Sequence, residues 1–296
     1  MKNNLYKKPE LIAEVGCNHM GDLNIAKNFI KTGKEFCDLE IIKFQKRDPK
    51  SLLSEEQYNQ PHPVEENSFG KTYGEHREFL EFNIEQHKIL QKYCLKLGLE
   101  YFSSVWDIQS TIDICSLNTS KIKIGSATNT NKEVLEYLCK NYHGDIHLSL
   151  GMTTRKEEEE IIDLFLKYNK NKNLIIYACT STYPTTAEDI CLLEISRLLA
   201  KYKEKNIVKD IGFSGHHKGI AIDVAAYLLG ANYIERHYTL DRTWKGTDHS
   251  ASLEPDGIRK LKRNLDQVYS ALNYKDKEVL DSEIEFREKL KYKLQT

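Results

Sequence analysis

Short apolar runs alternate with longer amphipathic segments along the chain. Eight runs have the length and β-branched composition of buried strands, at residues 11–16, 40–45, 101–105, 121–126, 146–151, 174–180, 210–215 and 233–239. Each is followed by a segment in which apolar residues recur every three or four positions, which predicts helices at 23–36, 85–97, 107–117, 131–140, 154–168, 188–203, 219–229 and 255–272. Near-continuous apolar strands separated by helices are typical of a parallel sheet buried on both faces.

Eight strand–helix repeats predict an α/β fold of the (β/α)8 TIM-barrel type. The chain of 296 residues fits this fold, which usually takes about 250 residues plus extensions. An open doubly wound sheet is the alternative, but the GxGxxG phosphate loop that often accompanies it is absent from the sequence. We therefore expect one barrel domain over residues 1–272.

Three segments need separate interpretations. Residues 46–84 form a long insertion after the second strand, and the aromatic, histidine and arginine content of FGKTYGEHREFLEF predicts an ordered piece near the barrel mouth. Residues 273–296 are highly charged and predict a C-terminal tail with a terminal helix. The four glutamates at 157–160 begin a helix, where the helix dipole favours negative charge, and we expect them to form a solvated face.

Composition excludes several partners. The net charge is −1, so no strong field indicates nucleic acid or a membrane surface as a partner. The seven cysteines are scattered and never form a CxxC pair, which favours a reducing compartment. The N-terminus carries no apolar leader, and no apolar stretch is long enough to span a bilayer. We therefore expect a cytoplasmic protein.

Polar residues gather where the predicted strands end. In a barrel these ends share one rim, which carries the active site in TIM-barrel enzymes. The rim set comprises Glu14, Asn18, His19, Lys43, Gln45, Ser103, Ser104, Lys123, Ser126, Thr180, Ser181, Tyr183, Ser214, His216, Glu235 and His237. Two lysines among several hydroxyls suit a small, highly charged oxyanion such as a phosphate. Two histidines would hold a metal with open positions, which suits polarisation of a carbonyl better than a closed structural zinc site.

Structural roles remain open for some of these residues. Lys43 lies inside a strand, where a buried ion pair would also explain it. Ser126 and Ser181, taken singly, are also compatible with helix capping. Cys179 has many apolar neighbours, and we expect an inert buried thiol rather than a nucleophile.

Longer motifs at these positions point to a known family. They are IAEVGCNHMGD, KFQK, GKTYGEHREFLEF, KIGSA, LSLGM, CTSTYPT, GFSGHHKG and LGANYIERHYTLDRTWKGTDHSASLEP, and together they span nearly the whole chain. The sequence resembles the sialic acid (N-acetylneuraminate) synthase family, and its motifs are more similar to the animal-type branch than to typical bacterial members. The resemblance implies a transferase that condenses phosphoenolpyruvate (PEP) with a mannosamine-type sugar and releases phosphate.

The resemblance also assigns roles to individual residues. It implies a divalent metal, usually Mn²⁺ with Mg²⁺ or Co²⁺ as alternatives, held by His216 and His237. The implied PEP contacts are Lys43, Ser104, Lys123, Ser126, Ser181 and Ser214. The implied contacts to the acceptor sugar are Glu14, Asn67, Tyr183 and Asp248. In this scheme C3 of PEP attacks the open-chain aldehyde, water adds at C2, and phosphate leaves with cleavage of the C–O bond. Glu14 is expected to move protons or to orient the sugar and water.

This chain departs from the family pattern in ways that bear on the acceptor. Ala127 and Thr128 stand where many members carry Gly-Glu, and Ser104 stands where many carry threonine. Many members also continue into an antifreeze-like C-terminal domain that covers a partner's active site. No such domain follows the barrel in this sequence. Either another loop closes the site, for which the 46–84 insertion is the candidate, or the acceptor is held more loosely, and a homodimer stays an open expectation.

The acceptor itself stays open between N-acetylmannosamine, its 6-phosphate, mannose and a dideoxy-diamino hexose. A phosphorylated acceptor would need basic residues at the mouth, for which the candidates are Lys46, Arg47, Lys71, Arg77 and Lys245. Two other functions compete with the synthase. A metal-dependent barrel hydrolase predicts further ligands such as an HxH pair after the first strand, where only NHM is found. A non-catalytic sugar-binding or phosphate-binding relic of the family would explain the missing lid domain and Thr128.

Overall fold

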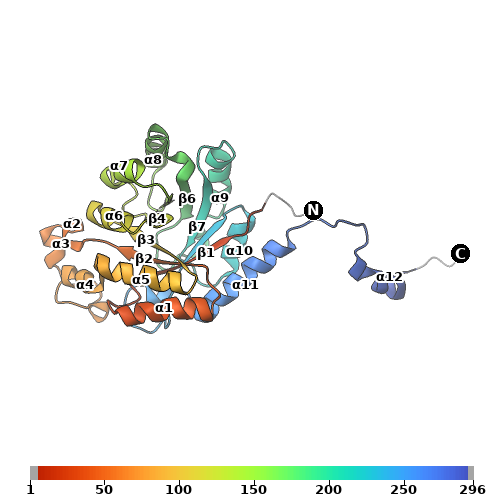
Figure 1. Cartoon of the computed structure of the whole chain (residues 1–296), viewed down its shortest axis with the longest axis horizontal. Coiled ribbons are helices and arrows are strands. Elements are labelled where there is room, and N and C mark those ends of the chain that lie inside the picture. The colour runs from red at the N-terminus through yellow and green to blue at the C-terminus, as the bar shows by residue number, and fades with distance from the viewer. Residues whose placement is uncertain (1–5, 293–296) are drawn as a thin grey trace.

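A closed barrel of eight parallel strands forms the centre of the molecule (Figure 1). The computed structural model describes residues 6–292. The strands are β1 (Glu10–Gly16), β2 (Ile41–Lys46), β3 (Glu100–Val105), β4 (Lys121–Ile124), β5 (Asp145–Ser149), β6 (Leu174–Cys179), β7 (Asp210–Gly215) and β8 (Tyr233–His237). Each strand pairs with the next in chain order, and β8 closes the barrel against β1 from Glu10↔Tyr233 to Glu14↔His237. The predicted (β/α)8 fold is confirmed.

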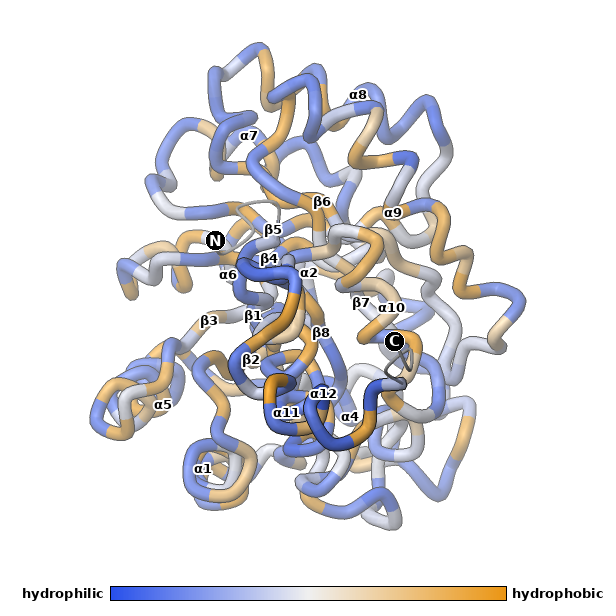
Figure 2. The backbone as a smooth tube through the Cα atoms, turned by 90° about the vertical axis from the view of Figure 1, so that its right-hand side faces the viewer, coloured by the Kyte–Doolittle hydropathy of each residue, from blue (hydrophilic) through white to orange (hydrophobic). Residues whose placement is uncertain are grey.

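Helices follow the strands and cover the outside of the barrel. They are α1 (Leu23–Glu35), α5 (Ile84–Lys96), α6 (Ile108–Cys115), α7 (Lys132–Asn141), α8 (Arg155–Lys167), α9 (Leu193–Leu198), α10 (Ala221–Leu228) and α11 (Pro255–Ala271). The Thr154 hydroxyl accepts from the backbone N–H of Glu157, and the Glu157 carboxylate accepts from the backbone N–H of Thr154. This pair is a capping box at the start of α8. Figure 2 shows a hydrophobic segment at the central strand β6, whereas the outer turns of α7 and α8 are mostly hydrophilic.

Some boundaries differ from the sequence prediction. β4, β5 and β8 each end two residues earlier than expected, because the chain turns out of the sheet there to form the rim loops. The predicted helix 188–203 is divided into a short 3-10 turn, α9 and a π turn. Cys191 lies in the left-handed region with φ 52°, which a right-handed helix cannot continue through.

The barrel interior has an apolar level and a polar level. Side chains alternate between the two faces of a strand, so residues two apart both point inward. The apolar level consists of Ile12, Ile41, Phe102, Ile175, Tyr177 and Tyr233. Two residues further along β1, β2, β3 and β8 lie Glu14, Lys43, Ser104 and Glu235, all buried. The interior therefore places charged groups on an apolar floor at the carboxyl ends of the strands.

The two segments outside the bare repeat have their own helices. The 46–84 segment contains α2 (Pro49–Leu52), α3 (Glu55–Asn59) and α4 (Tyr73–Leu80). The predicted tail contains α12 (Ile284–Leu290), which lies apart from the barrel in Figure 1. The last four residues of that tail, 293–296, lie outside the described residues. Within residues 6–292, no helix combines the length and apolarity needed to span a membrane.

The expected solvated glutamate face is wrong for one of its members. Glu158 is only 2% exposed and lies in an ion-pair cluster between α8 and α9. Arg197 donates to its two oxygens at 2.9 and 2.6 Å, and the Tyr202 hydroxyl donates at 2.8 Å. These partners outweigh burial and lower the pKa of Glu158 to about 2. A run of like charges in sequence hides this burial, because consecutive helix positions face different directions.

Candidate active site

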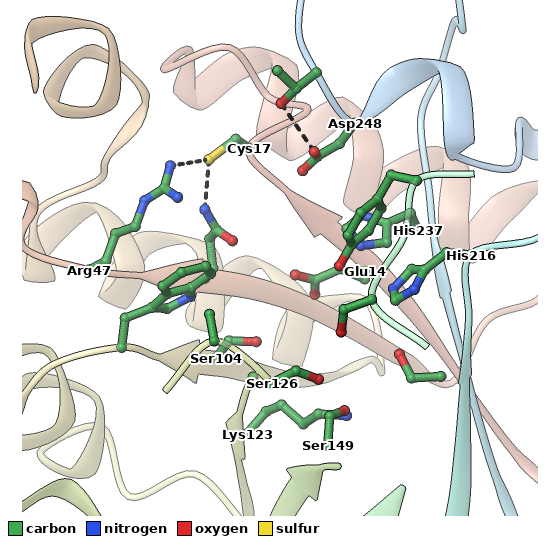
Figure 3. Close-up of a pocket in the computed structure, with 18 of the residues that line it drawn as sticks. Glu14, Cys17, Arg47, Ser104, Lys123, Ser126, Ser149, His216, His237 and Asp248 are labelled. Atoms are coloured by element: carbon green, nitrogen blue, oxygen red, sulfur yellow. Dashed lines mark hydrogen bonds between the residues drawn. The ribbon is translucent and has the colours of Figure 1, made fainter. Parts of the chain in front are cut away.

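A cavity of about 380 Å³ opens at the carboxyl ends of the strands (Figure 3). The predicted site residues that line it are Glu14, Lys43, Ser104, Lys123, Ser126, Ser181, Tyr183, Ser214, His216, His237 and Asp248. The remaining predicted residue, Asn67, is not among the lining residues. Its side-chain oxygen accepts a 3.3 Å hydrogen bond from the backbone N–H of Gly246, in the loop that carries Asp248. With Ser149 of β5, which also lines the cavity, the structure brings residues from all eight strand ends into one site and leaves Asn67 to support the loop.

Four charged side chains form a continuous chain across the cavity floor. Lys43 pairs with Glu14 and lies 3.8 Å from Glu235, and Lys123 lies 3.1 Å from Glu235. Burial raises the pKa of Glu14 to about 7 against the lowering influence of Lys43. Burial also raises the pKa of Glu235, but Lys123 and Lys43 outweigh it and bring that pKa to about 2. The two carboxyls thus differ in role, because Glu235 stays ionised whereas Glu14 can exchange a proton near neutral pH.

Three small side chains converge on a space beside Gly151. A Cβ added at Gly151 would lie 2.2 Å from the Ser181 hydroxyl, 2.6 Å from the Ser126 hydroxyl and 3.2 Å from the Cys179 sulfur. The two hydroxyls have only weak contacts to that sulfur, at 3.7 and 3.8 Å. Burial raises the pKa of the Cys179 thiol, which favours the inert thiol expected from the sequence. The hydroxyls are therefore free to donate to an anion, in a space that exists because residue 151 has no side chain.

The two histidines lie side by side at the ends of β7 and β8 (Figure 3). Their ring centroids are 5.5 Å apart, and the Tyr183 ring lies 4.2 Å from that of His216. Burial lowers the pKa of His216 to about 4 and also lowers the pKa of His237, so both imidazoles are neutral at pH 7. Neutral imidazole is the form that binds a metal.

The hydrogen bonds of these rings fit a divalent metal. Nδ1 of His216 lies 2.8 Å from the Thr180 carbonyl oxygen, which only accepts, so Nδ1 carries the hydrogen and Nε2 keeps its lone pair. Nδ1 of His237 is buried and has no hydrogen-bond partner in the described part of the chain. Among residues 6–292, no group of three or more His, Cys, Asp or Glu side chains is placed to hold an ion. The donor set fits a metal with two protein ligands and several open positions rather than a closed structural site.

A glycine also makes room around His237. Gly16 has φ 53°, and a Cβ there would lie 3.5 Å from Glu14, 3.6 Å from Asp248 and 3.9 Å from the His237 ring. The three side chains therefore surround one point at the end of β1. Carboxylates on either side of an imidazole can accept hydrogen bonds from a ligand at this point and exchange protons with it.

The 46–84 segment forms one wall of the cavity mouth. His62, Tyr73, His76, Arg77 and Leu80 all line the cavity. Arg77 donates to the Tyr73 hydroxyl at 2.7 Å and lies over its ring. The aromatic and basic residues of GKTYGEHREFLEF predict an ordered segment near the mouth, but not the contacts of individual side chains.

Sequence reasoning missed other residues of the site. Glu235 was placed at the rim without a role, although it joins both lysines. Cys17 accepts hydrogen bonds from Arg47 (Figure 3) and from Gln45. Trp106 lies under the Arg47 guanidinium. The strand period signals Glu235, since it points inward like His237 two residues later. The other contacts join separate loops, which no local pattern reveals.

Comparison with known proteins places this geometry in a family. A model of the NeuB family matches residues 29–277. N-acetylneuraminate-9-phosphate synthase of Mus musculus is 38% identical over 280 residues, which cover 95% of this chain and 76% of the relative. N,N'-diacetyllegionaminic acid synthase of Campylobacter jejuni is 32% identical over 267 residues, which cover 90% of this chain and 78% of the relative.

A solved structure gives the same result. The crystal structure of N-acetylneuraminic acid synthetase from Leptospira borgpetersenii, in complex with citrate, has a TM-score of 0.78 and 28% identity, and the match covers 97% of this chain and 94% of that one. Identity to the mouse relative exceeds identity to the Campylobacter relative, which confirms the expected similarity to the animal-type branch. The chain belongs to the NeuB family of sialic acid synthase-like proteins.

Proposed function

We propose that this chain is a nonulosonic acid synthase that condenses PEP with a mannosamine-type sugar and releases phosphate. The observation that carries the proposal is the convergence of two lysines, several hydroxyls and two neutral imidazoles in one cavity. Such a set can bind a phosphate and a carboxylate while a carbonyl is activated beside them. The named relatives are synthases of this class, which supports the same reaction here.

In the proposed reaction the floor of the cavity binds PEP. Lys43 and Lys123 provide positive charge, and the hydroxyls of Ser126 and Ser181 donate to phosphate oxygens in the space beside Gly151. Ser104 accepts from Lys43 at 2.6 Å and Ser214 donates to Glu235 at 3.0 Å, so both position the charged groups. In our proposal C3 of PEP faces the histidines.

The opposite side of the cavity would hold the open-chain aldehyde. A divalent metal, Mn²⁺ in our proposal, would be held by His216 and His237 and would supply Lewis-acid polarisation of the aldehyde oxygen. C3 of PEP then forms a bond to the aldehyde carbon, whose oxygen takes up a proton. Water adds at C2, and phosphate departs with its bridging oxygen. Glu14, with its pKa near 7, can give or accept a proton in these steps.

We further propose that the acceptor carries a 6-phosphate. Among the basic residues at the mouth, Arg47 pairs with Glu81 and Lys46 lies 3.3 Å from Asp113. Arg77 lines the cavity, and within residues 6–292 its guanidinium donates to the neutral Tyr73 hydroxyl and pairs with no carboxylate. A half-buried guanidinium without a carboxylate is suited to a phosphate. The similarity to N-acetylneuraminate-9-phosphate synthases supports this acceptor.

Phosphate release tests both parts. With PEP and Mn²⁺, we expect release only when a sugar is present, and faster release with N-acetylmannosamine 6-phosphate than with the unphosphorylated sugar. Arg77→Ala should raise KM for the phosphorylated sugar about 10- to 100-fold, the range for a hydrogen bond to a charged group. Lys71→Ala is the matched control, because Lys71 is an exposed cation of the same segment that does not line the cavity.

The outcomes separate the competing functions. Release without any sugar would favour the barrel hydrolase, and no release with any acceptor would favour the non-catalytic relic. Equal kinetics with the two sugars, unchanged by Arg77→Ala, would refute the 6-phosphate assignment alone. The cytoplasmic location and the homodimer stay predictions.

A further inference from the structure

The Lys123 ammonium contacts both a carboxylate and the face of an aromatic ring. It is 1% exposed, and its ammonium nitrogen lies 3.2 and 3.1 Å from the two oxygens of Glu235. The same nitrogen lies 3.4 Å from the centroid of the Tyr177 ring. An ammonium over a ring face is attracted by the quadrupole of the ring, and the attraction is strongest when water is excluded. Tyr177 is fully buried in the apolar level of the barrel, so this contact is dry.

The Tyr177 side chain is held by contacts on two sides. Gly212 of β7 is paired with Tyr177 of β6, and a Cβ at Gly212 would lie 2.5 to 2.7 Å from the ring. On the other side, the Tyr177 hydroxyl lies 2.6 Å from Nδ1 of His147 on β5. His147 is itself buried and contacts the ring of Phe102. The ring is therefore held in one place beneath the ammonium.

A ring and a carboxylate act differently on a lysine. A second carboxylate would neutralise the ammonium and take up its remaining N–H donor. A ring attracts the positive charge through its face without neutralising it, so an anion in the cavity is a stronger acceptor for the third N–H than the ring is. Lys123 also lines the cavity, and Figure 3 shows it beside Ser149 at the cavity floor. The arrangement leaves a charged donor for an anion in the cavity.

We propose that Tyr177 is a positioning residue whose ring face holds the Lys123 ammonium on the cavity floor, so that its free N–H is presented to PEP. The proposal rests on the proposed function, because PEP is the anion that Lys123 would bind. It assigns a role in substrate affinity to a residue that does not line the cavity. Without the ring, the ammonium would shift toward Glu235 or lose its proton, and either change weakens anion binding.

The test changes the ring face while keeping its shape. Binding of PEP to the full chain in the presence of Mn²⁺ is measured by calorimetry, which reports the Kd of folded molecules. Tyr177→Phe keeps the ring, and we expect its Kd to stay within about 3-fold of the unmodified protein. Pentafluorophenylalanine at position 177 keeps the size but reverses the charge of the ring face, and we expect Kd to rise about 10- to 30-fold. Tyr177→Leu should give a similar rise.

A second buried tyrosine provides the control. The Tyr101 hydroxyl on β3 also lies 2.5 Å from Nδ1 of a buried histidine, His87, but Tyr101 packs in the core between strands and helices. No lysine of residues 6–292 lies over its ring. Tyr101→Leu should therefore lower stability and leave the Kd for PEP within about 2-fold, since large-to-small core changes act on folding.

Each outcome has a distinct meaning. A higher Kd with pentafluorophenylalanine, together with a normal Kd for Tyr177→Phe, supports the ring-face role. Equal Kd values for these two variants overturn it. If both variants bind PEP equally weakly, the hydroxyl bond to His147 is what matters rather than the ring face. A rise in Kd for Tyr101→Leu equal to that for Tyr177→Leu also overturns it. No PEP binding by the unmodified protein would instead refute the proposed function.

Discussion

Replacing Gly151 by alanine fills the space in which the Ser126 and Ser181 hydroxyls face each other. The added Cβ would lie 2.2 Å from one hydroxyl and 2.6 Å from the other, so both side chains must rotate away. Gly151 does not have a positive φ, and alanine is therefore compatible with its backbone. The change removes the proposed phosphate contacts without adding or removing a charge.

The magnitude follows from the two displaced donors. A hydrogen bond to a charged group contributes about 1.5–3 kcal/mol, so losing two gives about 3 kcal/mol or more. At about 1.4 kcal/mol for each factor of ten, the Kd for PEP should rise about 100-fold or more. We expect little change in thermal stability, because the filled space is part of an open cavity.

A double-mutant cycle is the assay. PEP binding is measured for Gly151→Ala, for Ser126→Ala/Ser181→Ala and for the triple variant, with Gly257→Ala on α11 as a control outside the cavity lining. If the methyl group acts by displacing the hydroxyls, Gly151→Ala should cost less than about 3-fold once they are gone. Unchanged PEP binding in the single variant, or additive losses in the cycle, would refute the hydroxyl cradle.

Three further predictions test separate parts of the structure. Glu158→Ala should lower the free energy of unfolding at pH 7 by about 3 kcal/mol, because Arg197 loses its buried partner. The pKa of Glu158 is about 2 in the folded state against a reference value of 4.5, so this contribution is complete above pH 4.5 and is lost as the pH falls toward 2. The difference in free energy of unfolding between variant and parent, measured in urea melts, should therefore shrink over that window. A difference independent of pH would contradict the ion-pair explanation. His216→Ala and His237→Ala should each abolish stable Mn²⁺ binding in equilibrium dialysis, whereas His76→Ala at the mouth should retain it, and retained binding in the first two would refute the metal assignment. The pH profile of kcat/KM should show a limb near pH 7 from Glu14, and Glu14→Gln should remove that limb; a profile that keeps it would assign the limb to another group.

The fold is predictable because burial imposes a period on the sequence. A strand covered on both faces must be apolar at successive positions, and runs such as LIIYAC show this directly. The ends of elements are less predictable, since they depend on where a loop leaves the sheet. Cys191 illustrates the limit, because its left-handed conformation follows from the path of the rim loop and not from its own preference. Glu158 was misjudged because its partners Arg197 and Tyr202 come from another helix.

The site is predictable to the extent that chemistry collects at strand ends. Lys43, Lys123 and the two histidines come together because a closed barrel brings all eight strand ends to one rim. The seating of Tyr177 against Gly212 could not be predicted, since it depends on the register between β6 and β7. The position of Arg77 depends on how a long insertion folds over the mouth, which periodicity does not determine.

The fate of the bridging oxygen of PEP tests the central claim most directly. PEP labelled with ¹⁸O in its C–O–P bridge is incubated with the protein, Mn²⁺ and N-acetylmannosamine 6-phosphate, and the products are analysed by mass spectrometry. We predict that the label appears in inorganic phosphate, in amounts equal to a new product that combines the carbon skeletons of PEP and the sugar. Unlabelled inorganic phosphate formed together with pyruvate, with the sugar unchanged, would show hydrolysis at phosphorus and would contradict a synthase at this rim.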